Sequence, residues 1–552
     1  MAMSDKNFFD YIVIGGGSAG CVVAARLAEE KLGSVLLLEA GQSAEENPEI
    51  LNTDGFKESF AKENTFWHRM TLKQPHSGNR PIFVGSGKTI GGGGSVNGMV
   101  YTRGDIHDFA QWPASWQWED VVPAFEAVEN RLRVRHRTPT KFTELCIKAA
   151  LKVGYRQKDS LNDGHLCGYL GYNDMNFEDD QRRSSYVAFI HGREKELVGL
   201  TIISEATVNK ILFDDQGVAT GVEYSKDGAI QTAHIGEELI VSAGALETPK
   251  LLMLSGIGPK QDLEKFSIPV VKDVESIGKN LQDHPSVCIF YTGTRPIDFY
   301  YPQVYGFTRV NDRLALADGQ ADTCIALFTA GSVMKHTLLR LMPIMLLPGK
   351  LHRIKILRKI IRAAVEIAFL LPMLRSFVAR LYGMVVILGK PLSRGELHLQ
   401  STNPEDQAAI DMAFFKNPED MNTMVTAVEL THQISQQSEL VEWGNKLLSK
   451  AVASGNRKKI EQWIGNSAIT VFHYSGTCAM GETATAPVDL NLKLRGIKNL
   501  RIADASVVPV LPVSALNAPS MMIGYRAADF IISEHRQRAA DHSVQEMNAE
   551  TG

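Results

Sequence analysis

Hydrophobic positions near the start of the chain change their periodicity twice within a short stretch. Residues 10–14 (DYIVI) and residues 34–40 (SVLLLEA) are almost continuous apolar runs, which is the pattern of buried strands. Between them, residues 21–30 (CVVAARLAEE) carry apolar side chains at the spacing of a helix. A glycine-rich turn at 15–20 joins the first run to this helix. The pattern therefore predicts a strand–turn–helix–strand unit, the opening of an α/β fold.

The turn at 15–20 reads GGGSAG, a G-x-G-x-x-G motif. Gly15 permits the tight turn, Gly17 lets the backbone approach a pyrophosphate, and Gly20 lets helix and strand pack closely. Glu39 ends the second apolar run, where a carboxylate accepts hydrogen bonds from ribose hydroxyls and repels a 2′-phosphate. We interpret the unit as a site for FAD or NAD rather than NADP, with its place at the opening of the chain favouring permanently bound FAD. A glycine-rich turn that binds nothing is the alternative.

Composition restricts the class of protein. The 552 residues are 44% hydrophobic and 22% charged, as in globular proteins, and the formal net charge of −4 gives no indication of nucleic-acid binding. The six cysteines are scattered without a CxxC pair, so we expect reduced thiols and no metal site. No export signal and no long apolar run is present, which predicts a cytoplasmic protein without a membrane-spanning helix.

Several later blocks share a family pattern with the opening motif. Residues 87–110 read GKTIGGGGSVNGMVYTRGDIHDFA, and residues 244–258 read GALETPKLLMLSGIG. Three more blocks are IGKNLQDHP at 277–285, FHYSGTCAMG at 472–481 and LRIADASVVPVLPVSALNAPSMMIG at 500–524. Together these segments resemble the glucose–methanol–choline (GMC) flavoprotein oxidoreductases, above all the choline-dehydrogenase-like and alkanol-dehydrogenase-like bacterial members. The matching blocks frame nearly the whole chain.

The resemblance implies a mixed α/β fold: a Rossmann-like FAD-binding domain, and a discontinuous substrate-binding domain built on an antiparallel sheet with helices. Strands of the substrate-binding domain are expected at 286–293 (SVCIFYTG) and 395–401 (GELHLQS), and the polar C-terminal end is expected to be a loose tail. The expected order is FAD-binding 1–140, substrate-binding 141–199, FAD-binding 200–290, substrate-binding 291–474, FAD-binding and catalytic 475–535, and tail 536–552.

The glycine run at 91–94 offers backbone N–H groups with little bulk, suited to lie against a diphosphate or a flavin ring; a flexible surface loop is the alternative. Val96 stands where some family members carry a histidine bonded to the flavin, so the resemblance implies non-covalent FAD. Val208 is explained equally well as part of a core strand. The expected FAD-binding residues are Gly15, Gly17, Ser18, Ala19, Gly20, Glu39, Ala40, Gly91, Gly92, Ser95, Asn97, Gly98, Met99, Val100, Val208, Ala243, Asp504, Ala505, Ala518 and Pro519.

Oxidation of an alcohol by flavin needs a base for the hydroxyl proton, and histidine has a suitable pKa. His473 lies where an apolar run ends at a glycine turn, and the resemblance assigns it as the catalytic base. The resemblance assigns the second catalytic position to Asn517, whose amide can hydrogen-bond the substrate oxygen. A structural reading of Asn517 is a helix N-cap with Pro519 in the first turn, and both readings can hold together.

These residues predict FAD-dependent oxidation of an apolar primary alcohol to the aldehyde, with a quinone-type electron acceptor. An alcohol oxidase of the same fold that uses oxygen is the second reading, and a choline dehydrogenase is the third. A lyase or photodecarboxylase of this fold is disfavoured because the pair His473 and Asn517 is present. A flavoprotein without enzymatic activity is the last alternative.

Residues 333–381 differ from the rest of the chain, with ten lysines and arginines and a single acid, Glu366, among many apolar residues. Prolines 343, 348 and 372 are expected to divide this basic segment into short helices. A helical wheel over 351–362 places two sets on opposite sides: Ile354, Leu357, Ile360 and Ile361 against Lys355, Arg358, Lys359 and Arg362. This pattern predicts peripheral contact with the cytoplasmic membrane face. A buried part of the substrate domain, a subunit contact or a lining of the substrate entrance are the alternatives.

Overall fold

A first sheet of seven strands is built by segments far apart in the sequence. The computed structural model describes residues 7–347, 351 and 354–550. The strand order is β11-β2-β1-β14-β13-β12, and β25 pairs with β14. Strands β11, β2, β1, β14 and β25 run parallel to one another, whereas β12 and β13 complete the sheet as an antiparallel meander. The bounds are β1 Phe8–Ile14, β2 Val35–Leu38, β11 Leu200–Ile203, β12 Thr207–Phe213, β13 Ala219–Lys226, β14 Ala229–Val241 and β25 Leu500–Ile502.

Helices cover this first sheet because the central parallel strands are apolar on both faces. The four residues of β2 are all buried, as are Tyr11–Ile14 of β1. Helix α1 (Ser18–Glu29) packs against the long helix α17 (Asn517–Glu550), which also contacts α5 (Trp118–Leu132). The predicted strand–turn–helix–strand unit is thus confirmed as β1, α1 and β2.

A second sheet of eight strands lies beside the first and is almost entirely antiparallel. Its order is β23-β17-β20-β19-β18-β8-β7, with β24 paired to β17, and only β7 and β8 are parallel. The bounds are β7 Arg156–Gln157, β8 Tyr169–Tyr172, β17 Pro285–Thr292, β18 Val304–Thr308, β19 Thr323–Thr329, β20 Leu381–Leu388, β23 Lys446–Leu447 and β24 Ile469–Thr470. The predicted mixed α/β architecture is therefore confirmed. Strand β17 of this sheet spans residue 290, the position at which we expected the second FAD-binding part to end.

Shorter elements surround the two sheets. The helices are α2 Gly55–Ala61, α3 Gly93–Val96, α4 Ile106–Phe109, α6 Lys141–Leu151, α7 Ser185–Phe189, α8 Glu247–Leu254, α9 Lys260–Lys265, α13 Pro418–Ser435, α14 Ser438–Glu442, α15 Lys450–Ala453 and α16 Arg457–Ser467. The strands are β3 Phe66–Trp67, β4 Ser86–Gly87, β5 Val100–Tyr101, β6 Val134–Arg135, β9 Asp174–Glu178, β10 Gln181–Arg182, β15 Ile257–Gly258, β16 Lys272–Asp273, β21 Glu396–His398 and β22 Ala409–Asp411. Strand β21, expected in the large antiparallel sheet, instead pairs with β22 in a separate two-stranded ribbon.

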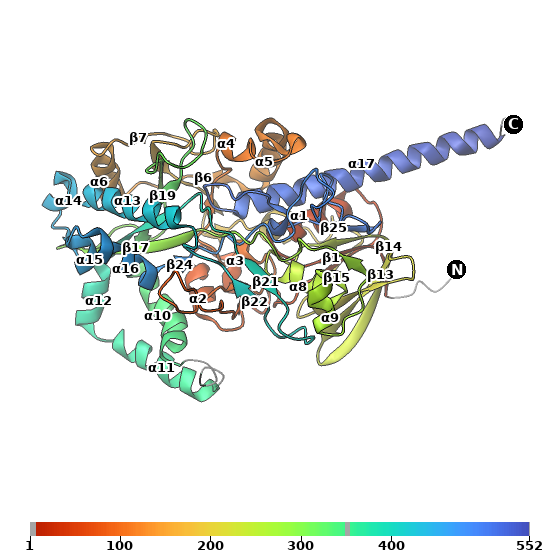
Figure 1. The fold of residues 1–552 in the computed structure, drawn as a ribbon, viewed down its shortest axis with the longest axis horizontal. Coiled ribbons are helices and arrows are strands. Elements are labelled where there is room, and N and C mark those ends of the chain that lie inside the picture. Colours follow the sequence, from red (N-terminus) through yellow and green to blue (C-terminus); the bar gives the residue numbers. More distant parts are fainter. Residues whose placement is uncertain (1–6, 348–350, 352–353, 551–552) are drawn as a thin grey trace.

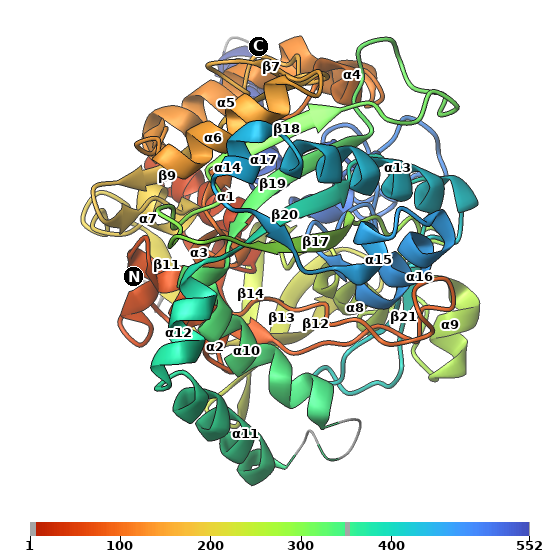
Figure 2. The ribbon, with the colours of Figure 1, turned by 90° about the vertical axis from the view of Figure 1, so that its left-hand side faces the viewer.

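Between β19 and β20 the chain leaves the second sheet and returns. The excursion contains α10 (Ala330–Leu346), α11 (Lys355–Ala368) and α12 (Pro372–Ala379). Figures 1 and 2 show α11 at the edge of the molecule, far from the first sheet. Pro343 lies within α10, so the expected break there is wrong, whereas Pro372 does begin a new helix. Pro348 lies outside the described residues.

The C-terminal end also differs from the expectation. Residues 536–550, predicted as a loose tail, continue helix α17, which projects beyond the body in Figure 1. The stretch is rich in Ala, Arg, Gln and Glu, which are good helix formers, so a helix already nucleated at Asn517 propagates through it. Among the described residues, none of the helices combines the length and the apolar character that a bilayer crossing requires.

Candidate functional site

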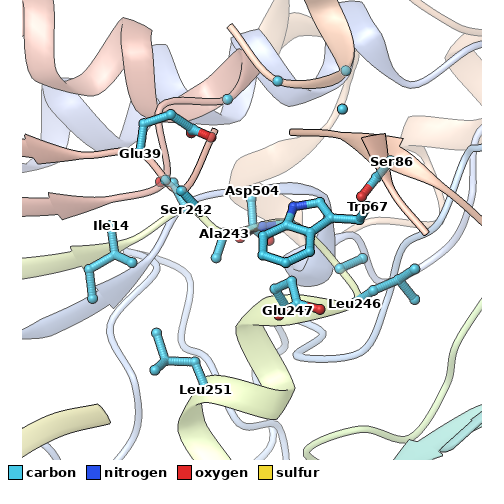
Figure 3. A pocket seen from close by; sticks show the side chains of 18 of the residues that line it. Ile14, Glu39, Trp67, Ser86, Ser242, Ala243, Leu246, Glu247, Leu251 and Asp504 are labelled. Carbon is cyan, nitrogen blue, oxygen red and sulfur yellow. Dashed lines mark hydrogen bonds between the residues drawn. The ribbon is translucent and has the colours of Figure 1, made fainter. Parts of the chain in front are cut away.

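A cavity that is partly open to solvent lies at the carboxyl ends of the parallel strands (Figure 3). The residues that follow directly on β1, β2 and β14 line it, as does Asp504 just after β25, and this is the edge where open α/β sheets bind ligands. Figure 3 shows Glu39 on one side of this cavity, and Trp67 and Ser86 on the other. Leu246 and the α8 residues Glu247 and Leu251 lie below Trp67 in this view and line the cavity.

The turn between β1 and α1 gives each of its glycines a separate steric reason. Gly15 has φ +96°, and a Cβ on it would come within 2.5 Å of the carbonyl oxygen of Ser242. A Cβ on Gly20 would overlap the carbonyl oxygen of Gly15, so only glycine lets helix and strand approach this closely. A Cβ on Gly17 would come no closer than 4.0 Å to Ser242 and would project into the cavity. No side chain caps α1, so its first backbone N–H groups face the cavity free for an anionic ligand.

The second glycine cluster lies against the first one. The backbone N–H of Gly91 donates to the carbonyl oxygen of Gly16 at 2.6 Å. A Cβ on Gly92 would come within 2.8 Å of Gly17 Cα, whereas one on Gly93 would meet nothing within 4 Å. Two glycine turns from distant blocks therefore form one cradle with open space above Gly17 and Gly93.

Arg182 holds the segment after the second glycine cluster. Its guanidinium donates to the carbonyl oxygens of Gly94 at 2.9 Å and Asn97 at 2.7 Å, and to Asn97 Oδ1 at 2.8 Å. The same Oδ1 accepts the backbone N–H of Met99, whose φ is +64°. Arg182 is fully buried, and burial lowers its pKa to about 9. Nothing in the sequence around Arg182 indicated this role.

Glu39 is turned toward the glycine turn by two backbone donors. Its Oε2 accepts the N–H of Gly16 at 2.8 Å, and its Oε1 accepts the N–H of Gly41 at 2.7 Å. Burial raises the pKa of the Glu39 carboxyl to about 7, although both hydrogen bonds and the charge of Lys88 act in the opposite direction. The carboxylate lies in the cavity wall, where each oxygen retains an unused lone pair for a hydroxyl donor.

Asp504 ties the strand β25 end to the α8 side of the cavity. Its Oδ2 accepts the N–H of Gly244 at 2.9 Å and the hydroxyl of Thr248 at 2.6 Å, while Oδ1 accepts the N–H of Ser506 at 2.7 Å. Burial raises the pKa of Asp504, against these hydrogen bonds. A Cβ on Gly244, which has φ +87°, would meet nothing within 4 Å.

A pair of histidines stands where the second sheet meets the site. The antiparallel register of β17 and β24 pairs Pro285 with Thr470, and this pairing sets His284 opposite the segment that follows Thr470. The Nδ1 atoms of His284 and His473 are 2.9 Å apart, with the two rings at 86°. The backbone N–H of His473 donates to Oδ1 of Asp283 at 2.8 Å.

Burial keeps both imidazoles of this pair neutral. It lowers the pKa of His473 to about 4. The pKa of His284 is well below its ordinary value, first because of burial and then because of the charges of His473 and Lys390. A neutral imidazole is the form that can accept a proton, so His473 is available as a base at neutral pH.

Asn517 is the first residue of α17, and the oxygen of its side-chain amide accepts a hydrogen bond from Ser18. The Ser18 hydroxyl donates to Asn517 Oδ1 at 3.0 Å. The Nδ2 atom of Asn517 is buried and has no hydrogen-bond partner among the described residues. A buried amide donor without an acceptor is costly unless a ligand satisfies it, which marks this atom as a candidate ligand contact.

The predicted site residues divide into two groups. The cavity wall contains Gly15, Gly17, Ser18, Ala19, Glu39, Ala40, Gly92, Val208, Ala243, Asp504 and Ala505. The remainder lie outside that wall: Gly20, Gly91, Ser95, Asn97, Gly98, Met99, Val100, Ala518, Pro519, His473 and Asn517. His473 borders the cavity through its chain neighbours Phe472 and Tyr474, and Asn517 borders it through Ser18, whose hydroxyl donates to Asn517 Oδ1.

Sequence reasoning missed several residues of the site. Trp67 and Glu247 line the cavity, and Glu247 is ion-paired with Arg69 at 2.8 Å and with Lys250 at 2.7 Å. Burial alone would raise the pKa of Glu247, but these two cations hold it below its ordinary value. His284 was inside the quoted block IGKNLQDHP, so a signal existed for it; no pattern indicated Trp67.

The fold and the cavity define a nucleotide-binding α/β protein with a second, antiparallel sheet. Comparison with known proteins identifies its family. Residues 9–286 and 391–524 match the GMC oxidoreductase family. The chain is 29% identical to an alcohol dehydrogenase [acceptor] of Pseudomonas putida, covering 97% of this chain and 98% of the relative. It is 30% identical to mitochondrial choline dehydrogenase of Mus musculus, covering 96% and 90%.

Solved structures show the same fold at lower identity. Pyridoxine 4-oxidase from Mesorbium loti matches with a TM-score of 0.80 at 24% identity, over 94% of this chain and 98% of that chain. A formate oxidase variant from Aspergillus oryzae matches with a TM-score of 0.82 at 23% identity, over 97% and 100%. The chain belongs to the GMC oxidoreductase family, as the resemblance predicted, and it carries out FAD-dependent oxidation of a CH–OH group.

The residues present fit FAD. The two glycine turns leave a cradle at the uncapped start of α1 for the diphosphate. The Glu39 carboxylate lies at the end of β2 in the cavity wall, where ribose hydroxyls can donate to it. The cradle and this carboxylate together match the diphosphate and a ribose of a dinucleotide.

Proposed function

We propose that this protein oxidises an apolar primary alcohol to the aldehyde, using non-covalently bound FAD and a quinone-type electron acceptor. The observation that carries the proposal is the position of His473: its imidazole is engaged at Nδ1 by His284, and its chain neighbours Phe472 and Tyr474 line the cavity. The similarity to an alcohol dehydrogenase [acceptor] over almost the full length of both chains supports the substrate class.

In this mechanism His473 takes the hydroxyl proton of the alcohol at Nε2. The Nδ1–H of His473 donates to His284, which orients the ring and leaves Nε2 with its lone pair. The Nδ2 atom of Asn517, which has no described partner, donates to the developing alkoxide oxygen, while the Ser18 hydroxyl holds the amide through Oδ1. Bound FAD supplies the hydride acceptor.

The proposal of non-covalent binding rests on the residue at position 96. Val96, the last residue of α3, is apolar and has no nucleophilic atom that could bond to the flavin. The test is acid precipitation of the purified protein: we expect all yellow colour in the supernatant. Flavin retained in the protein pellet would contradict the assignment.

The reaction itself is tested under anaerobic conditions. Octanol is added to the purified yellow protein, and the blue absorption band of the flavin is followed; we expect it to bleach. In His473→Ala the band should be present and should remain unbleached, since the cofactor cradle does not include this side chain. Bleaching of this variant at the wild-type rate would remove His473 from the mechanism.

The electron acceptor is examined with the same reduced protein. Admission of air should restore the band slowly, and a soluble quinone should restore it quickly, if the protein is a dehydrogenase. Immediate recovery in air would instead establish an oxidase. Bleaching with choline but not with octanol would overturn the proposed substrate class.

A further inference from the structure

The basic segment 333–381 forms most of an insertion between two adjacent strands of the second sheet, β19 and β20. Strands β19 and β20 are hydrogen-bonded neighbours, and their register pairs Thr329 with Tyr382. A short turn would join two strands with these ends. Instead the chain leaves at residue 330, forms α10, α11 and α12, and returns at residue 381 (Figure 2).

Only one side of α11 has a covering partner in the described part of the chain. Val365 is buried in a small cluster with Ala61 of α2 and Leu339 of α10. On the opposite side, Ile356, Ile360 and Ile367 are 60%, 58% and 64% exposed. Their spacing of four and seven residues puts these three isoleucines on a single face of the helix.

Arg358 and Arg362 of α11 point the other way, toward the body of the molecule. Arg358 pairs with Glu63 at 2.8 Å, and Arg362 donates to the carbonyl oxygens of Ala61 at 2.8 Å and Leu339 at 3.0 Å. The helical wheel separates these arginines from Ile360, and the structure adds that the arginine side meets the body while Ile360 faces outward. In water this arrangement is unfavourable, because the apolar side chains gain nothing from exposure.

The exposed apolar side chains extend beyond α11. Nearly half of the exposed large hydrophobic residues in the described part of the chain belong to this one excursion. They are Met345, Leu346, Leu351, Ile354, Ile356, Ile360, Ile367, Leu370, Leu371, Met373 and Phe377. Exposed apolar side chains gathered in one segment in this way indicate an interaction site.

Cationic side chains border the apolar surface. Lys355, Lys359 and Arg375 are exposed, and none of them forms an ion pair with another described residue. The only acid of the segment, Glu366, is already paired with Lys335 at 2.6 Å. Apolar groups flanked by unneutralised cations match the acyl boundary and the anionic headgroups of a phospholipid layer.

We propose that the outward surface of α11 and α12, with the adjoining end of α10, docks this protein on an anionic phospholipid bilayer. The isoleucines of α11 enter the acyl boundary, and Lys355, Lys359 and Arg375 contact headgroup phosphates. The helices lie on the membrane and do not cross it. A second copy of the chain is a poorer occupant, because a symmetric contact would bring two strongly basic segments together.

The proposal does not depend on the substrate, and its test involves no turnover. Purified flavin-loaded protein is floated with vesicles of phosphatidylcholine alone and with vesicles that also contain phosphatidylglycerol. We expect binding to the mixed vesicles, weakened at high salt because screening reduces the headgroup attraction. Absence of binding to both kinds of vesicle overturns the proposal, even if alcohol oxidation with a soluble acceptor is intact.

Two matched triple variants test the surface itself. Ile356→Ser, Ile360→Ser and Ile367→Ser together should weaken partitioning by about tenfold or more, from the apolar area that no longer enters the lipid. A control with equally exposed apolar residues elsewhere replaces Val198, Ile230 and Val441 by Ser, and it should bind like the wild type. Equal flotation of both triple variants would overturn the assignment of the surface.

A single-site probe covers the case of a poorly folding triple variant. An environment-sensitive fluorophore on Ile360→Cys should shift to the blue with mixed vesicles, and the same probe on Val198→Cys should not. Light scattering of the protein without lipid measures whether it is a monomer or a dimer. A wild-type dimer that the Ile356→Ser, Ile360→Ser, Ile367→Ser variant converts to a monomer would overturn lipid docking in favour of a subunit contact.

Discussion

The imidazoles of His284 and His473 are in contact through their Nδ1 atoms, at 2.9 Å, although the residues lie 189 positions apart. One nitrogen of this contact must donate and the other must accept. If His473 is the base at Nε2, its Nδ1 carries the proton and His284 Nδ1 accepts it. His284 is therefore a positioning residue for His473, because it selects the tautomer and the ring orientation.

This relationship predicts different effects for two substitutions of His284. His284→Leu removes the acceptor and should lower kcat by about 10²-fold, within the range attributed to a misplaced general base. His284→Asn retains an acceptor oxygen and should recover part of this loss. Rapid mixing with alcohol under anaerobic conditions measures both rates, and flavin content serves as the control. Equal activity of the Leu and Asn variants would contradict the positioning role.

The pH dependence of flavin reduction should follow the low pKa of His473. Burial lowers that pKa from an ordinary value near 6.5 to about 4, so the neutral base predominates throughout the neutral range. The rate should be constant from about pH 8 to pH 6 and should decline only as the pH approaches 4, with protonation of the base. An inflection of the rate near pH 7 that disappears in His473→Gln would show that burial does not lower the pKa of His473 to this extent.

The same depressed pKa has a consequence for stability. The unfolded chain binds a proton at His473 near pH 6.5, whereas the folded chain does so near pH 4. This group therefore favours the unfolded state increasingly as the pH falls from 6.5 to 4. His473→Gln should reduce the acid sensitivity of the melting temperature in that window.

Asn517 should affect catalysis more than folding. Asn517→Ala removes the Nδ2 donor that has no described partner and should lower kcat by about 10²-fold, as loss of one donor to a developing oxyanion does. Ser18→Ala tests the support, because it removes only the hydroxyl that fixes Oδ1, and its effect should be smaller. Activity is measured at saturating alcohol. An Asn517→Ala variant as active as the wild type would contradict this assignment.

Glu39 should make FAD binding depend on pH near neutrality. Burial raises its pKa to about 7, and ribose hydroxyls need the ionised carboxylate as acceptor. The Kd for FAD should therefore increase as the pH falls below 7, by up to about tenfold per pH unit. Titration of the flavin-free protein measures it. Glu39→Gln should flatten this dependence, whereas Glu45→Gln, an exposed neighbour, should leave it unchanged.

Replacing Gly20 and Gly17 of the turn by alanine should have different effects. A methyl group on Gly20 overlaps the Gly15 carbonyl oxygen, so Gly20→Ala should lower the free energy of unfolding by about 3 kcal/mol. A methyl group on Gly17 meets no protein atom within contact distance and projects into the cavity. Gly17→Ala should keep its stability within about 0.5 kcal/mol and lose FAD affinity. Denaturant unfolding of the flavin-free variants separates the two effects.

Much of the cofactor side of the site could be predicted because its chemistry is local in sequence. Glu39 follows a buried strand, and the motif at 15–20 needs glycine for the positive φ of Gly15 and for the close contact of Gly20 with the Gly15 carbonyl oxygen. Short apolar runs and glycine spacing encode such features directly. The long α17 was missed at its end because a polar stretch alone does not show that a helix has already been nucleated before it.

The orientation of α11 could not be predicted from its own pattern. A helical wheel separates isoleucines from arginines but does not say which side meets the body. Glu63 attracts Arg358, and the carbonyl oxygens of Ala61 in α2 and Leu339 in α10 attract Arg362, so these contacts turn Ile360 outward. The covering element, rather than the helix itself, decided the direction.

The amino-acid sequence by itself determined the glycine turns, the strand-end acid and the α/β class, because each depends on residues close together in the chain. Only the tertiary structure decided the partnership of His284 with His473, since it depends on the register between β17 and β24. The same holds for Arg182 under the second glycine turn and for the outward face of α11. Hydrogen bonds and burial between distant segments carry no signature in the local pattern, because either partner alone is compatible with many surroundings.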